Sequence, residues 1–173
     1  IGMGNGVCRW QLMEFLDGAM AEGTASLLGA NFRKAFVQLL ESDPASLAAD
    51  YQDIFGQMAR TYEMTIVAGS AYLPDANGVI RHRASVFGAD GSLLGWHDKM
   101  ILSPEDESIA GPGDAWHVIG TPAGPVGLLF GEEALYPETG RILAYQGAEL
   151  LIALGAVGDE SLAAHVRYAT IAR

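Results

Sequence analysis

The strongest pattern of apolar and polar positions lies between residues 43 and 62. Apolar side chains recur there at helical spacing, at Leu47, Tyr51, Ile54, Phe55, Met58 and Tyr62. Polar side chains occupy the opposite face, at Asp50, Asp53, Gln57 and Arg60. The preceding run Ser42-Asp43-Pro44 is typical of a helix start, because proline is favoured in the first turn. We predict a helix here, with its aromatic and methionine side chains in the core.

Helical spacing elsewhere predicts further helices, and short apolar runs rich in β-branched residues predict strands. The expected helices cover residues 23–42, 136–145 and 162–173. The expected strands cover residues 65–70, 79–87, 93–100, 116–120, 125–130 and 149–154, with turns at 74–78 and 90–91 and a polar loop at 103–113. Hairpins pair strands antiparallel and strand–helix–strand units pair them parallel, so this order predicts a mixed sheet with helices on one face.

The stretch from Gly127 to Arg141 joins an apolar strand to a helix through a tight corner at Gly131-Glu132-Glu133. A strand that turns sharply into a helix is where α/β enzymes present a reactive group. The residue in the presenting position is Gly131, which has no side chain to react. The stretch therefore predicts the place of a site without supplying its nucleophile.

Composition bounds the class of protein. A length of 173 residues fits one domain, and a hydrophobic fraction of 50% with a mean hydropathy of +0.19 predicts a packed core. The net charge of −11 and the pI near 4.6 argue against a general nucleic-acid surface, which needs clustered lysine and arginine.

Cysteine usage and hydropathy indicate the compartment. The single cysteine, Cys8, excludes an internal disulfide framework and a cysteine-based zinc site, and it fits a reducing environment. No apolar run approaches the ~20 residues of a membrane span. The N-terminus shows no basic segment followed by an apolar one, as a secretion signal would. We therefore expect a cytoplasmic protein that binds neither membranes nor nucleic acids.

Other candidate chemistry is weaker. The four histidines are scattered along the chain without metal-ligand spacing, at His82, His97, His117 and His165. Neighbours on a strand face opposite sides, so we interpret Trp96-His97-Asp98 as a surface histidine and aspartate around an inward tryptophan or lysine. The glycines at residues 2–6 lack the strand and the Lys-Ser/Thr of a phosphate loop. We predict no cofactor and no metal.

Residues Val79 to Glu138, with their flanks, carry a series of motifs in order. TIVAGS precedes a hairpin that ends in GADGSLLGWHDKM, which is similar to a "G-x-x-x-x-x-Y-x-K" strand with Lys99 as its lysine. Gly111-Pro112-Gly113 and the strand T-P-x-G-x-V-G-L-L-F follow. The next two motifs are similar to "F-P-E-x-x-R" at residues 136–141 and to "G-A-x-x-(apolar)" at residues 147–151. This ordered set resembles the carbon–nitrogen hydrolase (nitrilase) superfamily.

The resemblance implies an α/β fold of the α-β-β-α sandwich type with mixed sheets, and a Glu–Lys–Cys constellation. In that chemistry a cysteine thiolate attacks a nitrile or amide carbon, and water hydrolyses the covalent intermediate. The carboxylate takes the thiol proton and later activates water, and the lysine supports the negative charge that develops. The resemblance also implies a homo-oligomer. We expect residues 1–173 to form one partial domain of this family, incomplete at both ends.

Carried over residue by residue, Lys99 is the lysine and Glu14 is the candidate general base. Apolar and polar residues alternate from Cys8 to Leu12, which is weak strand character. Glu14 follows this short strand and precedes Phe15, as the family's "P-E" acid does, although Met13 stands where proline is usual. A second family acid falls at Asp106 or Glu107, with a register that is off by one.

The family cysteine stands seven residues before the glutamate of "F-P-E", and counting back from Glu138 gives Gly131. Glu138 and Arg141 are expected to be structural members of the following helix. Glu132 and Glu133 are interpreted as ordinary ion-pairing groups rather than nucleophiles.

Three functions follow for testing. The first is a hydrolase of small amides, nitriles or carbamoyl compounds, supported by Lys99 and Glu14 and opposed by Gly131. The second is a nitrilase-like protein without catalysis, inactive or impaired, that keeps a ligand pocket or an oligomerising surface. The third is a plain α/β binding domain with coincidental motifs.

Overall fold

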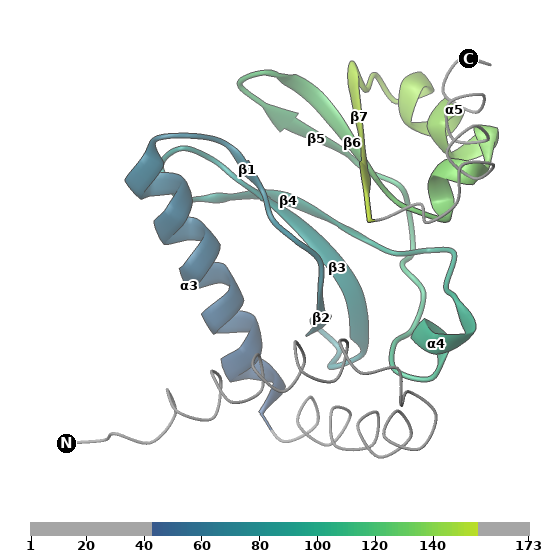
Figure 1. Cartoon of the computed structure of the whole chain (residues 1–173), viewed down its shortest axis with the longest axis horizontal. Helices are drawn as coiled ribbons and strands as arrows, with labels where there is room; N and C mark the ends of the chain where they lie inside the picture. The colour runs from purple at the N-terminus through teal and green to yellow at the C-terminus, as the bar shows by residue number, and fades with distance from the viewer. Residues whose placement is uncertain (1–42, 156–173) are drawn as a thin grey trace, which may run out of the picture. The chain divides into compact units, whose positions relative to one another are not determined.

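The structure is a computed structural model that describes residues 43–155 (Figure 1). The helices expected over residues 23–42 and 162–173 lie outside the described residues, as do Cys8 and the base candidate Glu14. The described residues form a mixed α/β structure of two sheets flanked by helices. No helix among them is both long enough and apolar enough to cross a membrane.

Helix α3 (Pro44–Tyr62) confirms the first predicted helix. The Asp43 carboxylate accepts a hydrogen bond from the Ser46 N–H at 3.1 Å and caps the first turn, and Glu63, with a left-handed φ of 50°, ends the helix. Tyr51 and Ala59 are buried against the sheet.

The predicted core face of α3 was too wide. The exposed set contains three residues expected inside, Ile54, Met58 and Tyr62. The face that meets the sheet is centred on Tyr51 and Ala59, with Phe55 half-buried between them. Ile54 follows Tyr51 by three positions, Tyr62 follows Ala59 by three, and Met58 precedes Ala59 by one. All three therefore lie at the edge of the face that meets the sheet.

The first sheet is antiparallel and has β3 (Ile80–Phe87) at its centre. Strands β1 (Ile66–Val67) and β2 (Ala71–Pro74) pair with one edge of β3, and β4 (Leu93–Asp98) pairs with the other. The hairpin at residues 90–91 is confirmed, with Gly91 at a φ of 82°. The single strand expected over residues 65–70 is instead β1 followed by a break, and β2 was not predicted.

The second sheet is mixed. Strand β6 (Gly124–Phe130) pairs antiparallel with β5 (Val118–Thr121) and parallel with β7 (Leu150–Leu154). The crossover from β6 to β7 runs through the 3₁₀ turn η1 (Glu133–Leu135) and helix α5 (Pro137–Tyr145), and it ends at Gly147 with a φ of 97°. Parallel neighbours need such a crossover, so the strand–corner–helix prediction is confirmed.

Three apolar clusters show how the layers pack. The cluster between the sheets consists of Ala84, Val86, Ile119, Val126, Leu128 and Phe130. A second cluster packs α3 on the outer face of the first sheet through Tyr51 and Phe87. A third packs α5 on the outer face of the second sheet through Leu129 and Leu143. The layers are therefore helix, sheet, sheet and helix, and the expectation of one sheet with helices on one face was wrong.

The segment expected to be a polar loop, residues 103–113, begins with a short helix, α4 (Pro104–Glu107). Ser103 caps it, and the Asp106 side chain bonds back to the Ser103 N–H to complete a capping box. This turn follows β4 after residues 99–103 and brings one acidic side chain inward.

Candidate functional site

Lys99 lies just beyond β4, and its buried side chain is the centre of a charged cluster. Its Nζ atom lies 2.7 Å from Oδ2 of Asp106 and 2.7 Å from Oε2 of Glu132. Two segments close in sequence, the end of β4 and helix α4, therefore meet the more distant corner after β6 at one ammonium group.

Asp106 is the most heavily bonded carboxylate of this cluster. Besides Lys99, it accepts hydrogen bonds from the Tyr72 hydroxyl at 2.6 Å and from the Ser103 hydroxyl at 2.9 Å. Burial alone would raise the pKa of this carboxyl, but the bonds from Lys99, Tyr72 and Ser103 outweigh it and hold the pKa well below its usual range. Asp106 is therefore ionised at neutral pH.

His82 completes the surroundings of Asp106. Its Nδ1 atom lies 3.0 Å from Oδ1 of Asp106, and its Nε2 atom lies 2.9 Å from the Ser70 hydroxyl. Burial lowers the pKa of His82, and although Asp106 opposes this effect the net shift is downward. The ring is therefore neutral at pH 7, and the bonding pattern assigns Nδ1–H as donor to Asp106 and Nε2 as acceptor from Ser70.

Glu132 is the solvent-facing member of the cluster. Its side chain is 53% exposed, whereas that of Lys99 is 5% exposed. Burial acts to lower the pKa of Lys99, but the bonds from Asp106 and Glu132 prevail and raise it. With His82 neutral, one ammonium and two carboxylates leave one negative charge in excess, so the cluster does not attract anions.

A second polar pair, Glu133 and His97, is fully buried behind the first. Glu133 Oε2 accepts hydrogen bonds from His97 Nε2 at 2.9 Å and from the Phe130 N–H at 2.8 Å. Glu133 Oε1 accepts from the Met100 N–H at 2.7 Å and from the Ile101 N–H at 3.4 Å. Burial would raise the pKa of Glu133, but the bond from His97 and the backbone amides lower it.

The interpretation of Trp96-His97-Asp98 was wrong for His97 and for the tryptophan, but the inward lysine that it allowed is confirmed, since Lys99 is buried. His97 faces inward and is fully buried, while Trp96 is 44% exposed and Asp98 bonds to Arg83 on the opposite face of the sheet. Neighbours alternate between the two faces as expected, and His97 shares with Lys99 the face that meets the second sheet.

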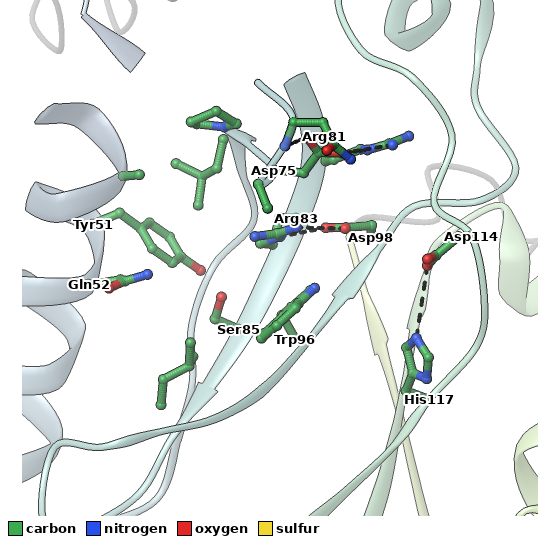
Figure 2. Close-up of a pocket in the computed structure, with 16 residues that line it drawn as sticks. Tyr51, Gln52, Asp75, Arg81, Arg83, Ser85, Trp96, Asp98, Asp114 and His117 are labelled. Atoms are coloured by element: carbon green, nitrogen blue, oxygen red, sulfur yellow. Dashed lines mark hydrogen bonds and ion pairs between the residues drawn. The ribbon is translucent and has the colours of Figure 1, made fainter. Parts of the chain in front are cut away.

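A cavity of about 430 Å³ lies away from Lys99, between α3 and the outer face of the first sheet (Figure 2). Arg83 crosses it and makes two bonds to Asp98, at 2.6 and 2.8 Å, and its guanidinium lies 4.8 Å from the Trp96 ring centroid. Arg81 pairs with Asp75 at 2.8 Å. Both arginines are already neutralised, so this cavity offers no unpaired cation to a ligand.

Comparison with known proteins identifies the fold's relatives. A sequence profile of the carbon-nitrogen hydrolase family matches residues 25–173. The chain belongs to this family. The resemblance predicted from the ordered motifs is therefore confirmed.

Two curated relatives illustrate the similarity. Omega-amidase NIT2 of Bos taurus is 30% identical over 129 residues, which cover 69% of this chain and 46% of the relative. The probable hydrolase YhcX of Bacillus subtilis is 27% identical over 152 residues, which cover 82% of this chain and 29% of that protein. The chain thus spans about half the length, or less, of these family members.

Solved structures of the family share the fold. The carbon-nitrogen hydrolase from Helicobacter pylori G27 superposes with a TM-score of 0.69 at 27% identity, over 75% of this chain and 50% of that one. A mutant amidase from Nesterenkonia sp. AN1, in which acrylamide has added to the active-site cysteine, superposes with a TM-score of 0.59 at 22% identity, over 72% and 50% of the chains.

The residues suggested by the family pattern are only partly brought together. Lys99 is central, and the acid beside it is Asp106, whereas Glu107 is exposed on the other side of α4. Gly131 follows β6 directly and precedes Glu132. Glu14 lies outside the described residues. Glu138 and Arg141 lie on the exposed side of α5, which fits a structural place in that helix.

Several residues of the cluster were missed from the sequence. Tyr72 and His82 lie on β2 and β3, and no local motif connects them with Lys99. Two signals were available for the others. The spacing Ser103-x-x-Asp106 is that of a capping box, and His97 stands two residues before Lys99 on one strand face. Among residues 43–155, no group of three or more His, Cys, Asp or Glu side chains is arranged to hold a metal ion.

Proposed function

We propose that this chain keeps the lysine–carboxylate part of a carbon-nitrogen hydrolase site but has no thiol where the family pattern has its nucleophile. One observation carries the proposal: Gly131 joins the end of β6 to Glu132, whose carboxylate lies 2.7 Å from Lys99 Nζ. The position counted back from the "F-P-E"-like motif thus lies next to the lysine cluster, and it bears no side chain. The protein is then a nitrilase-superfamily pseudoenzyme, or an impaired hydrolase.

The chemistry of the cluster supports a loss of covalent catalysis. Amide and nitrile hydrolysis of this type needs a thiolate, and no cysteine, serine or threonine occurs between Gly127 and Glu138. Lys99 already bonds two carboxylates, so one of its three ammonium protons remains for a new oxyanion, which would lie beside the negative charges of Asp106 and Glu132. Neither carboxylate is a plausible substitute nucleophile, because both are held in charge-assisted bonds to the ammonium.

A second function, binding of a neutral amide without turnover, is favoured by the polarity of Glu132 and Lys99. The half-exposed carboxylate of Glu132 accepts hydrogen bonds, and the ammonium of Lys99 donates them. A carboxamide offers the complementary NH₂ donor and carbonyl acceptor. Another mutant of the Nesterenkonia amidase has been solved in complex with butyramide, which indicates the size of ligand to test first.

Covalent trapping tests the main proposal. The protein is incubated with an electrophilic amide analogue such as acrylamide, its intact mass is measured, and any adduct is then located by proteolytic mapping. We expect modification only at Cys8. A stoichiometric adduct within residues 127–138 would overturn the proposal.

Restoring the thiol tests the position. Gly131 is not among the glycines with a positive φ, so the backbone there accepts a side chain. In a Cys8→Ser background, Gly131→Cys should be alkylated faster at pH 6 than Gly69→Cys, an exposed position with nothing within 4 Å of its Cβ. Equal rates for the two thiols would count against Gly131 as the nucleophile position. Titration with butyramide, followed by amide chemical shifts of Glu132 and Lys99, tests binding separately.

Two broader expectations stay proposals. We propose that residues 1–173 belong to one domain of the family's α-β-β-α sandwich, and that the protein is a homo-oligomer. Large apolar side chains exposed at α5 and β7, among them Tyr145 at 89% and Leu150 at 48%, support an association surface. Sedimentation velocity measures the assembly, and a concentration-independent monomer would contradict the second expectation.

A further inference from the structure

Glu133 connects the two backbone segments that carry the lysine cluster. Its Oε1 atom accepts from the amide of Met100, the residue after Lys99. Its Oε2 atom accepts from the amide of Phe130, the residue before Gly131. A single buried carboxylate therefore sets how far the end of β4 lies from the corner after β6.

We propose that Glu133 is the positioning residue of this site and that it holds the Gly131–Glu132 corner where the Glu132 carboxylate meets Lys99. The inference deepens the proposed function because it concerns the same cluster. Its test needs neither a ligand nor turnover. The positioning role can therefore fail while the proposed function stands, and the proposed function can fail while the positioning role stands.

The exposure of the two neighbouring glutamates supports this division of roles. Glu132 has a side chain that is 53% exposed, and an exposed ion pair alone holds a side chain weakly. Glu133 is fully buried and receives four hydrogen bonds. The close contact between Glu132 and Lys99 therefore depends on a corner whose backbone is fixed by Glu133.

His97 supports Glu133 from the strand that leads to Lys99. The ring is fully buried, its Nε2 atom bonds Glu133, and its Nδ1 atom has no partner among the described residues. His97 thus donates from Nε2 to the carboxylate and orients it.

The carboxylate form of Glu133 is required by its donors. Each oxygen accepts from at least one backbone amide, so Glu133→Gln, which is isosteric, must place an NH₂ group against one of them. Either orientation of the amide loses a bond to the end of β4 or to the end of β6. Glu133→Gln therefore loosens the corner without creating a cavity.

The experiment follows the ammonium protons of Lys99. The sequence contains two lysines, Lys34 and Lys99, so a ¹⁵N-lysine spectrum is assigned with Lys34→Arg. We compare the rates at which the Lys99 ammonium protons exchange with water in the wild-type chain, in Glu132→Gln, in Glu133→Gln and in the double variant. Each single variant should accelerate exchange by about threefold or more, at the lower end of coupling energies between contacting residues. In the double variant, Glu133→Gln should add no further acceleration, because its effect passes through Glu132.

A matched control removes a charge elsewhere. Asp75→Asn takes away a carboxylate that bonds Arg81 at the outer edge of the first sheet, and it should leave Lys99 exchange unchanged. If Glu133→Gln folds and leaves exchange unchanged while Glu132→Gln accelerates it, the proposal is wrong. The proposal is also wrong if the two effects are fully additive.

A second pair of variants covers the case in which Glu133→Gln does not fold. His97→Gln keeps an N–H donor for Glu133, whereas His97→Leu removes it, so only the latter should accelerate Lys99 exchange. In the wild-type protein, the amides of Met100 and Phe130 should exchange slowly with solvent. Equal behaviour of the two His97 variants, or amides that exchange at the rate of open loops, would overturn the role of Glu133.

Discussion

The Nζ atom of Lys99 lies 2.7 Å from the Oδ2 atom of Asp106, and neither side chain is more than 6% exposed. Charges of opposite sign at this distance compensate each other's loss of hydration only if their remaining bonding sites are also filled. Tyr72, His82 and Ser103 fill those of Asp106, and Glu132 takes a further proton of Lys99. The pair therefore functions as one buried polar network.

Asp106→Asn should destabilise the protein by roughly 2–4 kcal/mol, because it leaves the Lys99 ammonium buried with only Glu132 as a charged partner. Chemical denaturation of the full chain measures the change in the free energy of unfolding. Glu107→Gln is the matched control: it removes an exposed carboxylate from the same turn and should change stability by no more than about 0.5 kcal/mol. Equal effects of the two variants would contradict the assignment of Asp106 as the partner of Lys99.

Acidification should weaken the fold through Asp106. The pKa of this carboxyl is lower in the folded state than its ordinary value, so the unfolded chain binds more protons in the acid range. The stabilisation is therefore present in full above the ordinary aspartate pKa and is lost as the pH falls through about 5 and below. The free energy of unfolding should fall more steeply between pH 5 and pH 3 in the wild type than in Asp106→Asn. Parallel curves would show that Asp106 is not the group responsible.

His82 should add a separate dependence at higher pH. Its folded-state pKa lies below its ordinary value, so protonation favours the unfolded chain as the pH falls through about 6.5. His82→Gln should flatten the stability curve between pH 7 and pH 5 while the Asp106-dependent part remains. In the wild type, imidazole ¹⁵N shifts should show a neutral ring with the proton on Nδ1, and the opposite tautomer would contradict the assigned bonding.

Periodicity predicted the elements that have one clearly apolar face or a long apolar run. Helix α3, the hairpin of β3 and β4, strands β6 and β7 and helix α5 all follow from such patterns. The division into two sheets did not, because alternation gives the face of a residue but not the sheet that it meets. The clue was in β6, where Leu128 and Phe130 face the other sheet and Leu129 faces α5, so apolar residues occur on both faces.

The site was predictable to the extent that its residues belong to ordered motifs. Lys99 follows from the hairpin motif, but the choice between Asp106 and Glu107 depends on one residue of register in a single-turn helix. The capping box favours Asp106, because a residue in that position turns its carboxylate back toward the first turn of the helix. Contacts from Tyr72 and His82 arise from strand pairing across the sheet, which no local pattern contains.

Gly113 connects the loop after α4 to the end of β4, and its substitution tests how closely that loop fixes Lys99. Its N–H donates to the Lys99 carbonyl at 2.9 Å, and a Cβ atom at this position would overlap the carbonyl oxygen of Asp98. Backbone cannot move aside as a flexible side chain can, so Gly113→Ala should cost about 1–3 kcal/mol or more and disturb the Lys99 signals. Gly120→Ala is the control, since its Cβ meets nothing within 4 Å, and it should change stability by about 0.5 kcal/mol or less. Denaturation curves and the Lys99 ammonium spectrum measure both effects, and equal stability of the two variants would show that the close approach of Gly113 to β4 does not exist in solution.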